Sequence, residues 1–131
     1  MKIVIVDTYY NGFLREFWKN NLSLIKRNYS LQKKTLLSAC FGTSDYYSYN
    51  LEKIGHKAED LIVNDEILQR QWARENNLKV RAAGLWAKLQ TLPLIHRVIG
   101  RPEWMQKIAL AQIKKYRPDV VYVQDLSALN P

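Results

Sequence analysis

Three short hydrophobic runs along the chain predict its strands. Residues 2–6 and 119–124 contain the continuous apolar runs IVIV and VVYV and are each followed by an aspartate, and residues 56–63 form a further strand whose buried part is the short run LIV. A run without polar alternation is typical of a strand that is covered on both faces of a parallel sheet. We therefore expect three buried parallel strands.

The segments between these runs carry apolar residues at helical spacing. They predict helices over residues 14–20, 31–39, 45–54, 64–75, 78–92 and 102–116, and a loop over residues 21–30. Ser30 and Ser44 are expected to cap the second and third helices, because a serine hydroxyl accepts hydrogen bonds from N–H groups of the first turn. Gly55 is expected to end the third helix in the left-handed conformation, and Asn11-Gly12 to form a turn before the first.

This order of elements predicts the fold class. Strand, helices, strand, helices, strand is the order of an α/β domain, because each long crossover brings the next strand in parallel. We expect one domain over residues 1–131, a three-layer sandwich with a Rossmann-like parallel sheet in the order 2-1-3 and helices on both faces. In such sheets ligands bind beyond the carboxyl ends of the strands.

The residues at those strand ends are the candidates for chemistry. Asp7 and Asp125 follow two neighbouring strands, so their carboxylates are expected to approach each other, and one of them is a candidate general base with a raised pKa. The other interpretation, which general experience favours, is that both carboxylates cap the helix or turn that follows them. The residues expected to line the same cleft are Tyr9, Tyr10, Asn11, Gly12, Phe13, Asn64 and Gln124.

Composition excludes several classes of protein. The 131 residues are 47% hydrophobic with nine glycines and prolines, which does not match intrinsic disorder. No apolar run approaches the roughly 18 residues of a membrane span, and the N-terminus resembles neither a secretory leader nor a transit peptide. We expect a cytoplasmic protein, either free or peripheral to a membrane. One cysteine and two histidines form neither an internal disulfide nor a structural zinc site, so we expect no metal.

The positive charge is concentrated in the second half of the chain. The net charge is +8, and residues 70–117 carry eleven lysines and arginines against two acids. One interpretation is a solvated face of the helices; the other is attraction to phosphate on an anionic membrane, a substrate or a nucleic acid. No recognised nucleic-acid motif is present, so a nucleic-acid partner is the less favoured of these.

Several common motifs are missing from the chain. There is no G-x-G-x-x-G after the first strand and no G-x-x-x-x-G-K-[ST], which argues against a dinucleotide cofactor or a phosphate loop for a nucleoside triphosphate. There is no G-x-S-x-G or H-E-x-x-H, which argues against the main hydrolase and zinc-protease classes. We expect no cofactor.

A set of short segments in order resembles a known family. These segments are MKIVIVD (residues 1–7), YYNGF (9–13), FGTSD (41–45), LEKIGH (51–56) and PDVVYVQD (118–125). In order and spacing they resemble the amino-terminal Rossmann-like half of GT-B glycosyltransferases, the bacterial group described as family 1 or family 4-like, with spore-maturation-type relatives. The resemblance spans nearly the whole chain.

The resemblance implies a role for each strand end. The loop over residues 10–13 and the segment Gln124-Asp125 would face the cleft that holds the hydroxyl acceptor, while a carboxy-terminal domain would hold the nucleotide-sugar. Because the sequence stops at Pro131, that second domain lies outside it, and the isolated chain is expected to be inactive in sugar transfer.

Two other functions compete with this one. The first is a basic stand-alone α/β module that binds nucleic acid or an anionic surface without catalysis, and the second is a subunit or regulator. A short sheet also leaves open edges, which favour pairing with a second copy into a homodimer.

Overall fold

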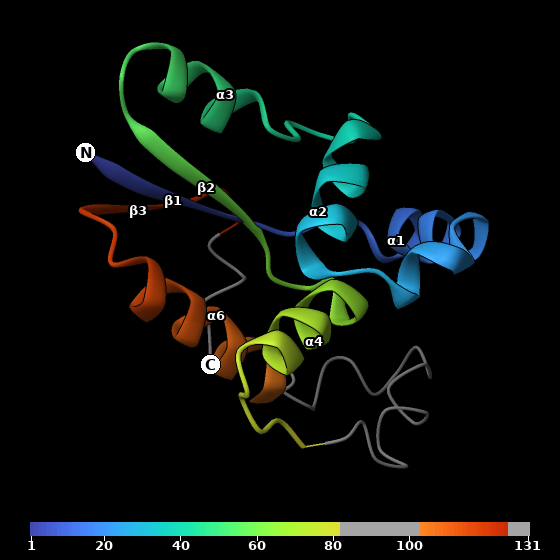
Figure 1. Ribbon diagram of the computed structural model, residues 1–131. Coiled ribbons are helices and arrows are strands. Elements are labelled where there is room, and N and C mark those ends of the chain that lie inside the picture. The colour runs from blue at the N-terminus through green and yellow to red at the C-terminus, as the bar shows by residue number, and fades with distance from the viewer. Residues whose placement is uncertain (82–102, 126–131) are drawn as a thin grey trace.

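The computed structural model describes residues 1–81 and 103–125. Its centre is a parallel sheet of three strands, β1 (Lys2–Asp7), β2 (Lys57–Ile62) and β3 (Val120–Val123). The strand order is β2-β1-β3, which confirms the predicted order and the α/β class. Helix α3 lies on one face of the sheet and α6 on the other, so the fold has the three layers that the sequence predicts (Figure 1).

The register of the sheet explains how β1 is covered on both faces. Val4 and Val6 pack with Met105 and Ala109 of α6 (Glu103–Tyr116). The alternate residues Ile3 and Ile5 form a second cluster with Ala58 of β2, and Leu51 of α3 (Tyr46–Lys53) packs against it. Because successive side chains of a strand point to opposite faces, a continuous apolar run is what a doubly covered strand requires.

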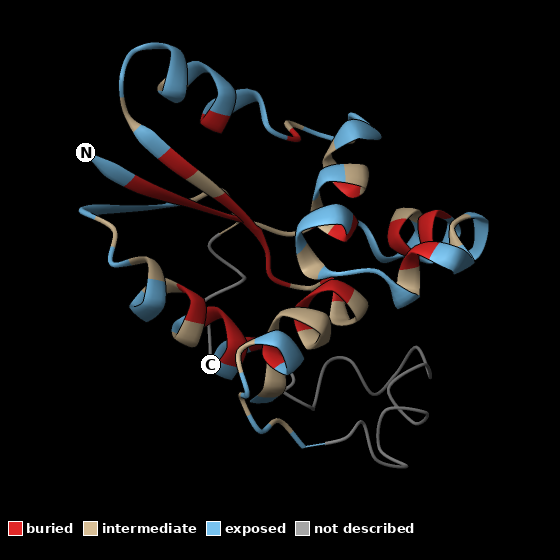
Figure 2. Ribbon diagram, viewed as in Figure 1, coloured by how far each residue is buried: buried red, intermediate tan, exposed pale blue. Residues whose placement is uncertain are grey.

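Strand β3 differs from the other two. Val120, Val121 and Tyr122 are each more than 40% exposed, whereas every residue from Ile3 to Val6 is buried (Figure 2). The expectation of a strand buried on both faces is therefore wrong for β3, although its position and direction are confirmed. An apolar run indicates that a strand can be buried on both faces. It does not show that other described elements cover those faces.

A further core lies beyond the carboxyl end of the sheet. It is built by α1 (Asn11–Asn20), the 3-10 helix η1 (Leu22–Lys26), α2 (Tyr29–Ser38) and α4 (Glu66–Glu75). Leu36 and Leu68 are fully buried at its centre, and Tyr9 and Ile62 join it to the strands. These helices therefore hold the strand ends in place.

Buried polar groups at the helix ends tie this core together. The Gln32 amide donates to the carbonyl oxygens of Leu24, Ile25 and Arg27 at 3.0–3.1 Å, which fixes the end of η1. Asp65, only 2% exposed, caps α4 by accepting a hydrogen bond from the Leu68 N–H at 3.2 Å and accepts the indole N–H of Trp18 at 2.9 and 3.0 Å. Burial raises the pKa of Asp65 to about 6.

The structure corrects the predicted starts of three helices. Asn11 and Gly12 are the first residues of α1 rather than a turn before it. Asn28, not Ser30, caps α2, and its side chain accepts a hydrogen bond from the Leu31 N–H. Ser44 does not cap α3; its hydroxyl donates to the Leu37 carbonyl, and α3 begins after Asp45.

The structure also bears on the segments predicted over residues 21–30 and 78–92. The segment predicted as a loop, residues 21–30, contains η1 and the first two residues of α2. Residues 78–81 are not helical, and the remainder of the helix predicted over residues 78–92 lies outside the described residues. The helices predicted over residues 64–75 and 102–116 are confirmed with small changes at their ends.

Gly55 and Gly12 offer a matched pair of substitutions. Gly55 has φ +89° and follows α3 as predicted, whereas Gly12 is helical, and an added Cβ would meet nothing within 4 Å at either position. We expect Gly55→Ala to lower the free energy of unfolding by about 1 kcal/mol through backbone strain alone. Gly12→Ala should raise it by up to about 0.5 kcal/mol, since alanine is the better helix former. Urea unfolding of both variants checks this, and equal signs for the two changes would contradict it.

Within the described residues, no helix has the length and apolar character that crossing a membrane requires.

Candidate functional site

The carboxyl ends of β1 and β3 bring two carboxylates to the same end of the sheet. The Thr8 hydroxyl donates to Asp125 Oδ2 at 2.6 Å, and the Thr8 backbone N–H donates to Asp7 Oδ1 at 2.8 Å. Both aspartates are partly exposed. One threonine therefore links the two side chains that the sequence places at neighbouring strand ends.

The surroundings of Asp7 change its acidity. Burial raises its pKa, the hydrogen bond from the Thr8 N–H lowers it, and the negative charge of Asp125 raises it again. The net effect is a raised pKa, because the loss of solvent outweighs the single hydrogen bond. A carboxylate in this position is a better proton acceptor than one in water.

The end of β2 serves a different purpose from the ends of β1 and β3. Asn64 accepts a hydrogen bond from the Tyr9 N–H at 2.9 Å and donates its own amide to the Tyr9 carbonyl at 2.6 Å. Tyr9 is only 3% exposed and its ring packs in the core. The sequence predicts that both residues line the cleft; in the structure, partly exposed Asn64 joins the chain after β1 to the chain after β2, and the buried ring of Tyr9 anchors that segment.

Aromatic side chains from the start of α1 and from the turn after α2 contact one another. Phe13 and Phe41 are stacked with ring centroids 4.0 Å apart, and Tyr10 meets Phe41 edge to face at 5.7 Å. Tyr10 is 79% exposed, which leaves most of its ring open to solvent. An exposed aromatic face supported from behind by other rings is a surface suited to stacking against a ligand.

A turn between α2 and α3 completes this end of the molecule. It includes Phe41, and its Thr43 hydroxyl donates to Gln124 Oε1 at 3.0 Å while the Gln124 N–H donates to the Val6 carbonyl at 2.9 Å. The turn is thus joined to the ends of both β1 and β3. We call the following set the strand-end site: Asp7, Thr8, Tyr10, Phe13, Phe41, Thr43, Gln124 and Asp125.

The start of α1 borders this site. Asn11 and Gly12 are exposed in its first turn, which holds no acidic residue, and Tyr10 at the cap position makes no side-chain cap hydrogen bond. Backbone N–H groups at such a helix start carry partial positive charge and favour electronegative ligand atoms. Asn11 and Gly12 therefore contribute backbone donors to the rim.

Sequence reasoning missed Thr8, Phe41 and Thr43 as members of the site. Thr8 lies in the sequence between the candidates Asp7 and Tyr9, and its role depends on a hydrogen bond to Asp125, which is far from it in sequence. Phe41 and Thr43 lie between helices, far in sequence from any strand end. The FGTSD segment of residues 41–45 was a signal for them, because it interrupts the helical pattern with a glycine.

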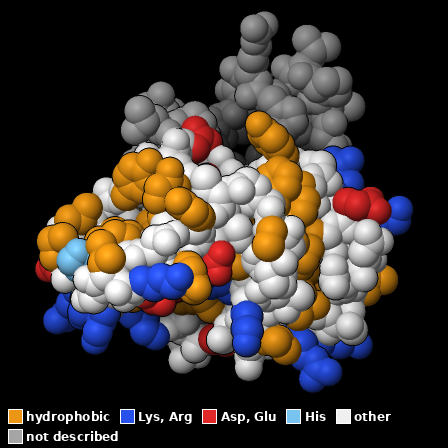
Figure 3. Space-filling view, turned by 90° about the horizontal axis from the view of Figure 1, so that it is seen from above, with side chains coloured by type: hydrophobic (Ala, Val, Ile, Leu, Met, Phe, Trp, Pro, Cys, Tyr) orange, Lys and Arg blue, Asp and Glu red, His pale blue; other side chains and the backbone are white. Residues whose placement is uncertain are grey.

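A tyrosine-rich surface lies on α3. Tyr46 is 64% exposed, Tyr49 is 54% exposed, and Tyr47 meets Tyr122 of β3 edge to face at 5.6 Å. Figure 3, seen from the α3 side, shows hydrophobic side chains gathered on this face. Core packing therefore does not claim these tyrosines.

Metal chemistry finds no support in the described part of the chain. Within residues 1–81 and 103–125, no three histidine, cysteine, aspartate or glutamate side chains are grouped so that they could hold a metal ion. Comparison with known proteins adds no assignment: no protein-family model matches the chain, and neither the curated proteins nor the solved structures gave a match. Function is therefore argued from the geometry of the site.

Proposed function

We propose that the chain is the acceptor-side domain of a glycosyltransferase and that the strand-end site binds a hydroxyl-bearing acceptor such as a sugar. The observation that carries this proposal is an exposed aromatic ring, Tyr10, that contacts Phe41 and follows closely in the chain on Thr8, which links the carboxylates Asp7 and Asp125. The C–H face of a sugar packs on an aromatic ring, and carboxylates accept hydrogen bonds from its hydroxyl groups.

The chemistry of such a domain is to orient the acceptor. A hydroxyl held beside Asp7 would give its proton to that carboxylate while its oxygen attacks the anomeric carbon of the donor, and the bond between that carbon and the nucleotide phosphate would break. The raised pKa of Asp7 suits it to accept this proton. Asp125 would hold a second hydroxyl, with Thr8 fixing its carboxylate.

The donor would come from a second domain. The resemblance to GT-B glycosyltransferases supports this arrangement, because in that group the nucleotide-sugar is held mostly by the carboxy-terminal domain. The parallel sheet with its site at the strand ends also supports it, since that is where α/β domains bind ligands. The 131-residue chain alone is then expected to bind an acceptor without transferring sugar to it.

Sugar binding by a matched pair of tyrosine variants tests the proposal. We expect saturation-transfer NMR to detect binding of at least one of glucose, galactose, N-acetylglucosamine and glycerol, and Tyr10→Ala to weaken it about tenfold. Tyr49→Ala is the control, because Tyr49 is also an exposed tyrosine but lies on α3 over Lys53. Asp7→Asn should weaken binding less than Tyr10→Ala, since an amide still accepts a hydrogen bond.

The same titrations separate the competing functions. No binding of any of these four compounds, or equal losses for the two tyrosine variants, would argue against an acceptor site at the strand ends. Binding of single-stranded DNA or of anionic vesicles that weakens steeply with salt and does not change in Tyr10→Ala would favour the basic binding module instead.

A further inference from the structure

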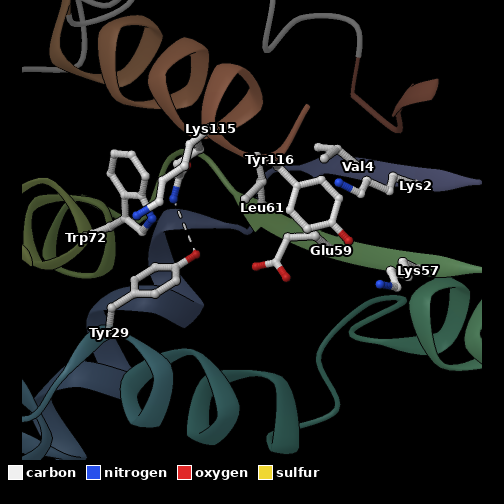
Figure 4. A pocket seen from close by; sticks show the side chains of 10 residues that line it. Lys2, Val4, Tyr29, Lys57, Glu59, Leu61, Trp72, Lys115 and Tyr116 are labelled. Carbon is white, nitrogen blue, oxygen red and sulfur yellow. Dashed lines mark hydrogen bonds between the residues drawn. The ribbon is translucent and has the colours of Figure 1, made fainter. Parts of the chain in front are cut away.

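A pocket that shares no residue with the strand-end site begins at the amino ends of β1 and β2 and runs along the sheet to α4. Its volume is about 430 Å³, and it lies between the sheet face that carries α6, the helix α4 and the start of α2. Figure 4 shows Tyr29, Trp72 and Lys115 at one end of this pocket, Lys2 and Lys57 at the other, and Glu59 and Tyr116 between them. We call it the amino-end pocket.

Two lysines stand side by side at one end of this pocket. Lys2 and Lys57 are register partners on adjacent parallel strands, so their side chains leave the sheet on the same face. The Asp119 carboxylate accepts from the backbone N–H of Lys2 at 2.7 Å, and the ion pairs found within residues 1–81 and 103–125 involve neither Lys2 nor Lys57. Two adjacent ammonium groups without a carboxylate partner attract a doubly charged anion.

Among the described residues that line the pocket, Glu59 is the one carboxylate, and it already has a cationic partner. Glu59 forms an ion pair with Lys33 of α2, on the wall opposite α6. The negative charge of Glu59 is therefore balanced by Lys33 and not by Lys2 or Lys57. The pocket as a whole keeps an excess of positive charge, to which Lys115 adds.

The other end of the pocket holds polar groups within an apolar wall. Gln112 is 4% exposed; its Nε2 donates to the Tyr29 hydroxyl at 3.3 Å, and its Oε1 has no hydrogen-bond partner among the described residues. Burial raises the pKa of Tyr29, so its hydroxyl keeps its proton. A buried acceptor without a partner costs free energy, so a donor on the body of the ligand would add to binding without being required for it.

The floor and walls between these ends are apolar and aromatic. Val4 and Leu61 form the sheet side, and the rings of Trp72 and Tyr116 line the helix side. Lys115 lies over the Trp72 ring, 5.9 Å from its centroid. The pocket therefore offers a cationic end for a charged group and an aromatic body for a flat or apolar one.

From this arrangement we propose that the amino-end pocket binds a small phosphate monoester with an aromatic or similarly apolar body, its phosphate held by Lys2 and Lys57. A phosphate monoester carries nearly two negative charges at neutral pH, which matches two adjacent lysines better than a single carboxylate does. The proposal is independent of the acceptor site, because the two sites share none of the residues on which either is argued.

Titration of the full chain with phenyl phosphate, followed by NMR, tests this proposal. We expect binding that shifts the indole N–H resonance of Trp72, assigned with Trp72→Phe. The double variant Lys2→Gln/Lys57→Gln should weaken binding about tenfold or more. The control is Lys107→Gln/Lys114→Gln, which removes the same charge from two exposed positions of α6. Benzyl alcohol and inorganic phosphate serve as probes of the two halves of the ligand.

Each outcome decides for or against the pocket. Two results together support the proposal. Phenyl phosphate binds more weakly only in Lys2→Gln/Lys57→Gln, and benzyl alcohol and inorganic phosphate each bind the wild-type protein more weakly than phenyl phosphate does. Equal losses in the two double variants would show attraction to the net charge only, and inorganic phosphate binding as tightly as phenyl phosphate would show that the aromatic wall plays no part. An unchanged Trp72 resonance at saturating phenyl phosphate would overturn the proposal. Binding in Tyr10→Ala should be unaffected, so failure here is distinct from failure of the acceptor site.

Discussion

Replacing Leu36 with alanine is expected to lower the free energy of unfolding by about 3 kcal/mol. Leu36 lies in α2 and is fully buried in the core beyond the carboxyl end of the sheet. The substitution removes buried methyl groups and leaves a cavity that the surrounding helices fill only in part. For a domain of this size the melting temperature should fall by roughly 10 °C.

The same helix provides a matched control. Leu31 is 43% exposed on α2, so Leu31→Ala has the same chemical change and the same helix propensity effect without the cavity. We expect it to cost less than about 1 kcal/mol. Urea unfolding followed by tryptophan fluorescence measures both changes, and a loss for Leu31→Ala as large as for Leu36→Ala would contradict the burial argument.

This prediction also bears on the strand-end site. Leu36 shares its core with Tyr9, whose backbone is held by both sides of the Asn64 amide. Loss of packing there should loosen the segment that positions Asp7 and Tyr10. We therefore expect Leu36→Ala to weaken sugar binding at temperatures where the protein is still folded, and Leu31→Ala to leave it unchanged.

The strands and the sheet order could be predicted from sequence because their signal is local and strong. Residues 2–6 form an apolar run that has few alternatives to a doubly covered strand, and long crossovers make the neighbours parallel. The burial of β3 could not be predicted in this way. Its run of valines is as apolar as that of β1, and exposure depends on what the rest of the chain places over it.

Helix starts were less predictable because several polar residues compete for each cap. Asn28 and Ser30 both lie at the start of α2, and Asn28 has the backbone conformation that lets its side chain reach the Leu31 N–H. The Asn11-Gly12 pair is a turn signal in isolation, yet packing of Leu14, Phe17 and Trp18 into the core extends α1 over it. Tertiary burial outweighs local preference here.

For the candidate site, topology was the useful guide and composition was not. The parallel strand order alone places Asp7 and Asp125 at the same end of the sheet. The hydrogen bonds of Thr8 then link the two carboxylates. Which of Tyr9 and Tyr10 faces solvent depends on the path of the chain after β1. The two tyrosines are adjacent, and no feature of the sequence indicates which of them is buried. The glycosyltransferase assignment itself stays a prediction.

Replacing Asp60 with asparagine is expected to make the protein more stable at neutral pH and to remove part of its pH dependence. Asp60 is 5% exposed on β2 beneath α3; the Ser48 hydroxyl donates to its Oδ2, and its Oδ1 has no hydrogen-bond partner among the described residues. Burial raises its pKa from 3.8 to about 6, against the lowering effects of the Ser48 hydrogen bond and the Lys33 charge. Glu59 and Asp45 add to the increase.

The direction of the pH effect follows from this raised pKa. The folded protein binds the proton of Asp60 more tightly than the unfolded chain does, so this group favours folding most below about pH 4, and that contribution is lost as the pH rises through about 6. One pKa unit corresponds to about 1.4 kcal/mol, so Asp60→Asn should gain up to roughly 3 kcal/mol over wild type at pH 7 and almost nothing at pH 4.

Urea unfolding at pH 4, 5, 6 and 7 measures this difference between the variant and wild type. Asp65, whose pKa is also raised, is present in both proteins, so its effect cancels. Glu52→Gln, at an exposed carboxylate of α3 that is not among the charges acting on Asp60, is the control and should show a small difference at every pH. A gain for Asp60→Asn that does not grow with pH would mean that the Asp60 carboxylate is not the source of the pH dependence.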